Sequence, residues 1–177
     1  MNERTIMTSS DIDRSLERIS MEILERNHGA ESLAILGIHT GGVYLAERIR
    51  EKIRRSENVS LPLGSLDITL YRDDWSLISQ HPIVKKTGIN FALEDLTVIL
   101  IDDVIFTGRT IRAAMDAIMD YGRPQAIQLA VLVDRGEREL PIQPDYVGQV
   151  VEVGNSEKVD VLLREQDNSD RVVLDVK

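Results

Sequence analysis

The sequence has no cysteine among its 177 residues, which excludes disulfide bonds, thiolate metal ligands and a cysteine nucleophile. It also has no apolar run approaching the roughly 18 residues that a membrane-spanning helix needs. The first residues lack the basic segment and apolar core of a secretory signal. We therefore expect a cytoplasmic protein that makes no contact with a membrane.

Positive charge is also scarce. Lysine and arginine number 21 against 30 aspartates and glutamates, so the formal net charge is −9. A negative molecule repels polyanions, and nucleic-acid binding would therefore require a local basic patch. The length predicts one domain over residues 1–177, because a chain of this size can bury a self-sufficient core.

Helix-like and strand-like segments alternate along the chain. Apolar side chains at helical spacing predict helices over 10–27 and 43–56, and Ile111, Met115 and Ile118 mark a third. Short apolar runs predict buried strands. These strands cover residues 33–38, 61–71, 97–101 and 126–133. The alternation predicts an α/β fold whose central, mostly parallel sheet is flanked by helices.

Two other segments lack this pattern. Residues 72–93 have mixed polarity and no clear period, which predicts a flexible arm. Near the end of the chain, apolar runs over 159–163 and 172–176 flank Asn168 and Ser169. They predict a peripheral hairpin, which would form a small β hood.

An acidic pair, Asp102 and Asp103, follows the predicted strand 97–101 and precedes a helix start that contains Thr107 and Gly108. Ligands of open parallel sheets bind at the carboxyl ends of strands. Free amides at a helix start suit a phosphate, whereas carboxylates accept hydrogen bonds from sugar hydroxyls. Either part alone could be a metal-binding loop or a helix cap. Their combination over 98–110 favours a sugar phosphate with a divalent cation nearby.

This segment resembles the phosphoribosyl pyrophosphate (PRPP) signature of the type I phosphoribosyltransferases. The similarity extends to a pyrimidine branch of that family, which combines uracil phosphoribosyltransferase activity with attenuation of the pyrimidine (pyr) operon. The segments that carry it are 66–74, 122–124, 127–136, 138–141 and 145–146. The resemblance implies a type I phosphoribosyltransferase fold, formation of UMP and pyrophosphate from uracil and PRPP, and Mg²⁺ as cofactor.

The resemblance also implies a role for each part of the site. Asp102 and Asp103 would hold the ribose hydroxyls and would bind Mg²⁺ indirectly, through PRPP or water. The loop for the 5-phosphate would consist of Val104, Ile105, Phe106, Thr107, Gly108, Arg109 and Thr110. The pyrophosphate loop would be Thr40, Gly41 and Gly42, whose glycines leave backbone donors uncovered. Gly41 stands where the family commonly has an arginine, so one contact to pyrophosphate or nucleotide is in question.

Four further residues complete the implied site. Arg72 begins the arm that would close over PRPP, and Arg135 would contact pyrophosphate or the nucleotide. Val133 and Asp134 would face the base. Phe106 stands where purine-using relatives have an acid, and an aromatic ring cannot accept a proton, which argues against hypoxanthine or guanine. Orotate would require a cationic partner that the sequence does not identify.

Two alternatives remain open at this stage. The first is an RNA-binding attenuator that contacts a pyr mRNA leader when UMP or UTP is bound, through Arg14, Arg18, Arg138 and Lys158. Against it, expected basic positions hold Gln143, Gln149 and Asn155, and residues 152–177 contain seven acids against four bases. The second is a nucleotide sensor with little turnover. The resemblance further implies a homodimer or a higher homo-oligomer.

Overall fold

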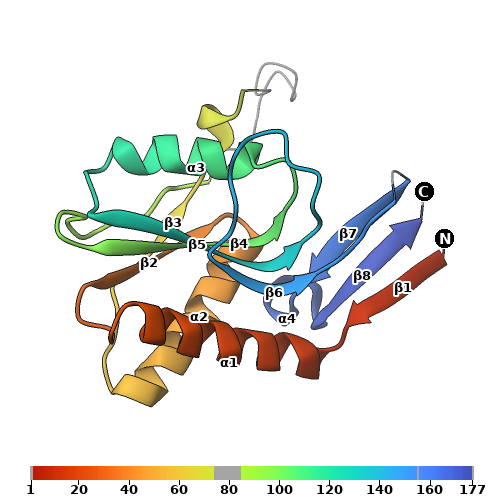
Figure 1. Cartoon of the computed structure of the whole chain (residues 1–177), viewed down its shortest axis with the longest axis horizontal. Coiled ribbons are helices and arrows are strands. Elements are labelled where there is room, and N and C mark those ends of the chain that lie inside the picture. Colours follow the sequence, from red (N-terminus) through yellow and green to blue (C-terminus); the bar gives the residue numbers. More distant parts are fainter. Residues whose placement is uncertain (1, 74–84, 155, 177) are drawn as a thin grey trace.

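The central layer is a five-stranded sheet whose strands all run parallel. The computed structural model describes residues 2–73, 85–154 and 156–176. The sheet has the order β3-β2-β4-β5-β6 (Figure 1). Its strands are β2 (Leu33–Ile38), β3 (Leu63–Leu66), β4 (Thr97–Ile105), β5 (Ala126–Asp134) and β6 (Tyr146–Val150). β2 lies inside the sheet and is buried at every residue, as its uninterrupted apolar run predicts.

Helices cover both faces of this sheet. The helices α1 (Ser9–Arg26) and α2 (Gly41–Glu57) lie on one face, and α3 (Arg109–Met119) lies on the other (Figure 1). The core is accordingly divided into two apolar clusters, one beneath α1 and α2 and one beneath α3. Thr8 and Asp11 form a reciprocal capping box that begins α1. The three predicted helices and the layered α/β architecture are confirmed.

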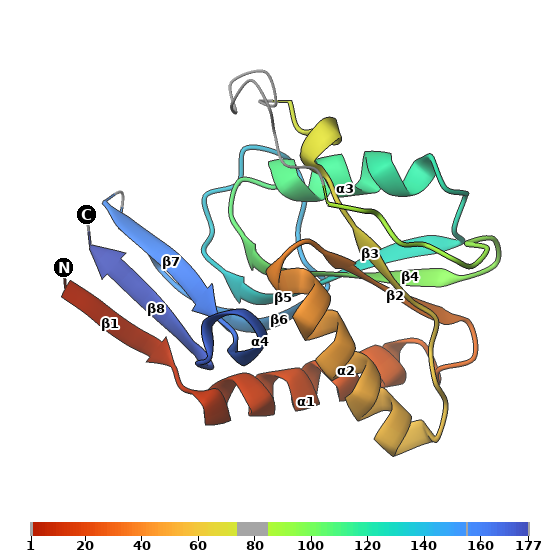
Figure 2. The ribbon, with the colours of Figure 1, turned by 180° about the vertical axis from the view of Figure 1, so that it is seen from behind.

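A second, antiparallel sheet lies at one end of the molecule (Figure 2). It has the order β1-β8-β7. Its strands are β1 (Asn2–Met7), β7 (Glu157–Leu162) and β8 (Arg171–Val176), with the short helix α4 (Arg164–Asp167) between β7 and β8. We call these elements the hood. The predicted hairpin is confirmed, and β1 adds a third strand that the sequence did not indicate.

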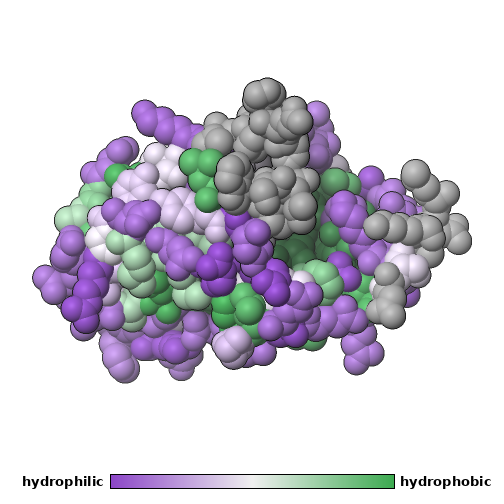
Figure 3. All heavy atoms as spheres, turned by 90° about the horizontal axis from the view of Figure 1, so that it is seen from above, coloured by the Kyte–Doolittle hydropathy of each residue, from purple (hydrophilic) through white to green (hydrophobic). Residues whose placement is uncertain are grey.

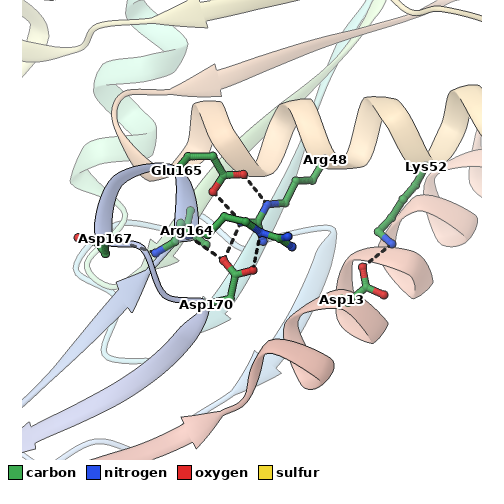
Figure 4. Close-up of polar contacts among 8 residues, drawn as sticks. Asp13, Arg48, Lys52, Arg164, Glu165, Asp167 and Asp170 are labelled. Carbon is green, nitrogen blue, oxygen red and sulfur yellow. Dashed lines mark hydrogen bonds and ion pairs between the residues drawn. The ribbon is translucent and has the colours of Figure 1, made fainter.

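An ionic cluster joins the hood to α2 (Figure 4). The Arg48 guanidinium, on α2, donates to Glu165 at 2.6 Å and to Asp170 at 2.7 Å, and Arg164 also contacts Asp170. The Arg48 side chain is 15% exposed and that of Asp170 only 6%. Largely buried ion pairs therefore connect the hood to α2.

Two strand ends differ from those predicted. The strand expected over 61–71 ends at Leu66, because the Asp67 carboxylate accepts from the Thr69 amide at 2.9 Å and turns the chain into a single 3-10 turn. The strand expected over 97–101 continues beyond residue 101, because β4 pairs with β5 as far as Ile105 opposite Asp134. β6 was not predicted at all.

The predicted arm lies partly outside the described residues, which exclude 74–84. Its described end is attached to β3 by paired backbone hydrogen bonds between Ser65 and Gly88, at 2.9 and 3.0 Å. Within the described ranges, no helix has both the length and the apolar character needed to cross a membrane.

Candidate active site

The acidic pair lies in the last part of β4, at the carboxyl edge of the sheet. Asp102 is 6% exposed and Asp103 is half-buried. The Asp103 amide donates to the Asp102 carboxylate at 2.9 Å, and the Val104 amide donates to that of Asp103 at 2.8 Å. Burial raises the pKa of both carboxyls, and the neighbouring charge of Asp103 raises that of Asp102 further. The pair is therefore ready to accept compensating donors or a cation from a ligand.

A pocket of about 270 Å³ opens beside the start of α3. We call it the α3 pocket; its lining consists of residues 104–111 together with Arg72 and Asp73. Gly108 has a φ of +92°, which glycine adopts without strain, and α3 begins at the next residue. The structure thus brings together the whole predicted phosphate loop and Arg72. The amide-rich helix start suits a phosphate group.

The turn over residues 40–42 lies directly against this acidic pair. A Cβ atom on Gly41 would meet Asp103 Oδ2 at 2.4 Å, and one on Gly42 would meet the Ile101 carbonyl oxygen at 2.4 Å. Only glycine permits so close an approach of the turn to β4. The helix α2 begins at Gly41, two residues earlier than predicted. The backbone amides at the start of α2 therefore lie close to the Asp103 carboxylate.

Arg109, the first residue of α3, has two acidic partners. Its guanidinium donates to Asp73 at 2.6 Å and to Glu139 at 2.6 Å, and its side chain is 46% exposed. These contacts tie the start of the arm to the loop that follows β5. Arg109 is also one of the residues that line the α3 pocket.

The predicted base region, Val133 and Asp134, lies at the end of β5, directly before Arg135. The Arg135 guanidinium stacks on the Phe106 ring, 3.9 Å from its centroid. Val133 is buried, and Asp134 accepts from Arg138 at 2.7 Å and from the Gly136 amide at 2.9 Å. Burial opposes ionisation of Asp134, but these hydrogen bonds and the Arg138 charge hold its pKa below the ordinary value.

Two cations have structural positions that sequence reasoning missed. Arg138, assigned above to RNA, has a side chain only 11% exposed, and it also donates to the Phe106 carbonyl at 3.0 Å. It therefore connects the α3 pocket to the base region. The Lys85 ammonium donates to the Thr40 hydroxyl of the turn. The sequence signal that could have identified Lys85 is the adjacent pair of lysines, Lys85 and Lys86, within the arm.

The other three RNA candidates come from separate elements. Arg14 and Arg18 lie on α1, where Arg14 donates to Ser10 and Arg18 donates to Glu22 and to two carbonyls of β6. Lys158 lies on β7 and pairs with Asp160 at 2.6 Å. Each of these three side chains therefore already forms a hydrogen bond or an ion pair within the chain. The view from above shows a surface on which hydrophilic side chains predominate (Figure 3).

The donor set constrains how a metal ion could bind. Among the described residues there is no group of three or more histidine, cysteine, aspartate or glutamate side chains that could hold a metal ion. The adjacent carboxylates of Asp102 and Asp103 are nevertheless the oxygen donors that Mg²⁺ prefers. They fit an ion that obtains most of its ligands from a bound phosphorylated compound and from water.

Comparison with known proteins agrees with this geometry. The family model for the phosphoribosyl transferase domain matches residues 7–162. The chain belongs to the phosphoribosyltransferase family. It is 56% identical over 170 residues to the Bifunctional protein PyrR of Deinococcus radiodurans, a match that covers 96% of this chain and 93% of the relative. The Bifunctional protein PyrR of Caldicellulosiruptor bescii is 55% identical over 172 residues, covering 97% and 94%.

Solved structures confirm the fold. A hypoxanthine phosphoribosyltransferase from Staphylococcus aureus superposes with a TM-score of 0.71 at 18% identity, covering 98% of this chain and 92% of that one. The hypoxanthine phosphoribosyl transferase of Trypanosoma cruzi gives 0.74 at 14% identity, covering 98% and 91%. Identities this low support the type I phosphoribosyltransferase fold alone and say nothing of the base.

Proposed function

We propose that this chain is a uracil phosphoribosyltransferase, which forms UMP and pyrophosphate from uracil and PRPP. The observation that carries the proposal is the juxtaposition of Asp102 and Asp103 with the α3 pocket on one side and the glycine turn on the other. An activated pentose has the matching three parts: vicinal hydroxyls, a 5-phosphate and a pyrophosphate. The strong similarity to bifunctional PyrR proteins supports the choice of the pyrimidine branch.

Each part of the substrate has a proposed partner. The carboxylates of Asp102 and Asp103 accept hydrogen bonds from the ribose hydroxyls, which offsets the cost of their burial. The backbone amides of 106–110 hold the 5-phosphate at the start of α3. The amides of residues 40–42 hold the pyrophosphate beside Asp103. Held at three points, the sugar presents its anomeric carbon in a fixed orientation.

The reaction is a displacement at that carbon. The bond to the pyrophosphate oxygen breaks with its electron pair going to pyrophosphate, a ring nitrogen of uracil forms the new bond, and the proton of that nitrogen is released. Positive charge develops on the sugar, and the proposal assigns its stabilisation to the carboxylate pair. Asp102 and Asp103 would hold Mg²⁺ indirectly, through PRPP or water, and the ion would supply charge neutralisation for the leaving group.

The base would lie between the Phe106–Arg135 stack and the end of β5. Phe106 is 38% exposed, so its ring is available to a planar ligand. It provides no proton acceptor for a purine nitrogen, which favours a pyrimidine. Arg138 fixes this wall through the Phe106 carbonyl and the Asp134 carboxylate.

The test is an assay with PRPP, Mg²⁺ and each nucleobase in turn, with pyrophosphate release as the readout. Release with uracil, and not with hypoxanthine, guanine or orotate, is the expected result. No release with any base, together with tight binding of UMP in calorimetry, would replace the enzyme with a nucleotide sensor. Release with hypoxanthine alone would place the chain in the purine branch.

A second proposed activity is regulatory: UMP- or UTP-dependent binding of a pyr mRNA leader. It is favoured by the word bifunctional in the names of the relatives. Filter binding to such a leader, with and without UMP and over a range of salt concentrations, tests it. The expected result is UMP-dependent retention that weakens steeply with salt. Retention that is equal with unrelated RNA would contradict it.

The remaining parts of the proposal concern the setting of the enzyme. We propose a homodimer or a higher homo-oligomer that works in the cytoplasm. Light scattering measured with size-exclusion chromatography determines the number of subunits, and a monomer at assay concentrations would contradict this part alone. Fractionation of cells tests the compartment.

A further inference from the structure

The proposed pyrophosphate site has no charged side chain of its own. Residues 40–42 are Thr-Gly-Gly, and the first turn of α2 continues with Val43 and Tyr44. Backbone amides alone would then face a group that carries several negative charges, close to the ionisable carboxyl of Asp103. Phosphate sites gain much of their affinity from charge-assisted hydrogen bonds. A cation should therefore come from another segment of the chain.

Lys85 is the cation that the structure places there. Its ammonium group donates to the Thr40 hydroxyl, at the residue that precedes α2. The side chain is exposed, so a ligand could reach it. Lys52 and Lys158, in contrast, have acidic partners: Lys52 pairs with Asp13 and Glu17, and Lys158 pairs with Asp160. The described contact of the Lys85 ammonium is with a neutral hydroxyl, which leaves its charge uncompensated within the part of the chain that the structure describes.

The backbone around Lys85 is held in place. Its amide donates to the carboxylate of Asp67, which is 8% exposed, and the Asp67 amide donates in turn to the Thr87 hydroxyl at 3.0 Å. Asp67 directly follows β3, whose last residue accepts from the His39 amide at 2.9 Å. Lys85 and Thr40 are thus both anchored to the same end of β3. The ammonium is positioned by this framework.

We propose that Lys85 binds the pyrophosphate group of PRPP and of the product, and so supplies the positive charge that residues 40–42 lack. This inference rests on the proposed function, because it takes the turn as the pyrophosphate site. On binding, the ammonium exchanges its hydrogen bond with Thr40 for a shared contact in which pyrophosphate oxygens accept. It stabilises the leaving group as negative charge accumulates there.

The experiment compares Lys85→Gln with Lys86→Gln, since Lys86 is the adjacent exposed lysine and has the same charge. For Lys85→Gln we expect the Kd of Mg²⁺-pyrophosphate and the KM for PRPP to rise about tenfold, equivalent to about 1.4 kcal/mol. UMP has no pyrophosphate, so its Kd should change less than twofold. Lys86→Gln should change all three less than twofold, and Lys85→Arg should retain most of the affinity.

Two results would overturn the inference. The first is equal pyrophosphate affinity in Lys85→Gln and Lys86→Gln. The second is a parallel loss of UMP and pyrophosphate affinity with a lower melting temperature, since that pattern indicates a structural role. The binding measurement is independent of turnover: if uracil were not a substrate, the proposed function would fail while calorimetry with pyrophosphate still decided the role of Lys85.

Discussion

Replacing Arg48 by methionine should destabilise the protein more than the loss of any surface ion pair. Methionine retains the apolar stem of Arg48 but removes the guanidinium from Glu165 and Asp170. The Asp170 carboxylate, 6% exposed, then keeps the hydrogen bond from the Arg164 amide and one ion pair, with the Arg164 side chain, which is 69% exposed. Breaking a buried pair from one side costs about 3–5 kcal/mol. Because Glu165 is 29% exposed, we expect the lower limit, about 3 kcal/mol.

Urea unfolding followed by circular dichroism measures this free energy. For a chain of this length, about 3 kcal/mol corresponds to a melting temperature lower by roughly 6–12 °C. The matched control is Arg54→Ala, because Arg54 pairs with Glu51 on the same helix and its side chain is 50% exposed, so that losing this solvent-screened pair should cost little. A loss for Arg48→Met no greater than that of the control would refute the reasoning.

The pH dependence gives a second check. The hydrogen bond from Arg48 lowers the pKa of Glu165; at Asp170 burial acts in the opposite direction, but Arg48 and the Arg164 amide still hold the pKa below its ordinary value. Carboxyls with a depressed folded pKa stabilise the protein above about pH 4, and this stabilisation is lost as the pH falls through the folded values. The difference in the free energy of unfolding between wild type and Arg48→Met should therefore become smaller as the pH falls below about 4. A constant difference would contradict the ionic origin.

Three further substitutions test the site. Asp103→Asn should lower kcat at least tenfold with an unchanged circular dichroism spectrum, and undiminished activity would remove Asp103 from the ribose site. Asp102→Asn should raise the melting temperature near pH 7, because burial raises the pKa of Asp102 and makes its ionised form costly. Below about pH 4 the variant and the wild type should have the same melting temperature. A lower melting temperature of the variant at neutral pH would contradict this. Gly42→Ala should destabilise by about 1–3 kcal/mol, since its Cβ would meet the Ile101 carbonyl oxygen at 2.4 Å; unchanged stability would show that α2 can move.

The central motif could be predicted because its information is local. An apolar run, two acids, a Thr-Gly pair and a helical stripe follow one another in β4 and α3, and each has a short-range physical signal. The end of β4 could not be located in this way. Asp102 and Asp103 stay in the strand because β5 continues to pair beside them as far as Asp134, and that partner is distant in sequence.

The missed elements depend on contacts of long range. β1 has few apolar residues and exists as a strand through its pairing with β8, about 170 residues away, while β6 is an edge strand interrupted by Gly148. The contact between Lys85 and Thr40 likewise depends on Asp67, which holds the end of the arm against β3. Composition and periodicity do not predict contacts between segments that are far apart in the sequence.

The register of the hood has a consequence for the order in which the protein can assemble. Asn2 pairs with Val176, and β8 is the middle strand between β1 and β7. During synthesis, residues 2–7 must therefore wait unpaired until residues 171–176 leave the ribosome, whereas the helices and the parallel sheet can form earlier. Truncation before residue 171 would remove β8 and leave β1 and β7 without the strand that pairs with both, so the hood is the last part of the fold to be completed.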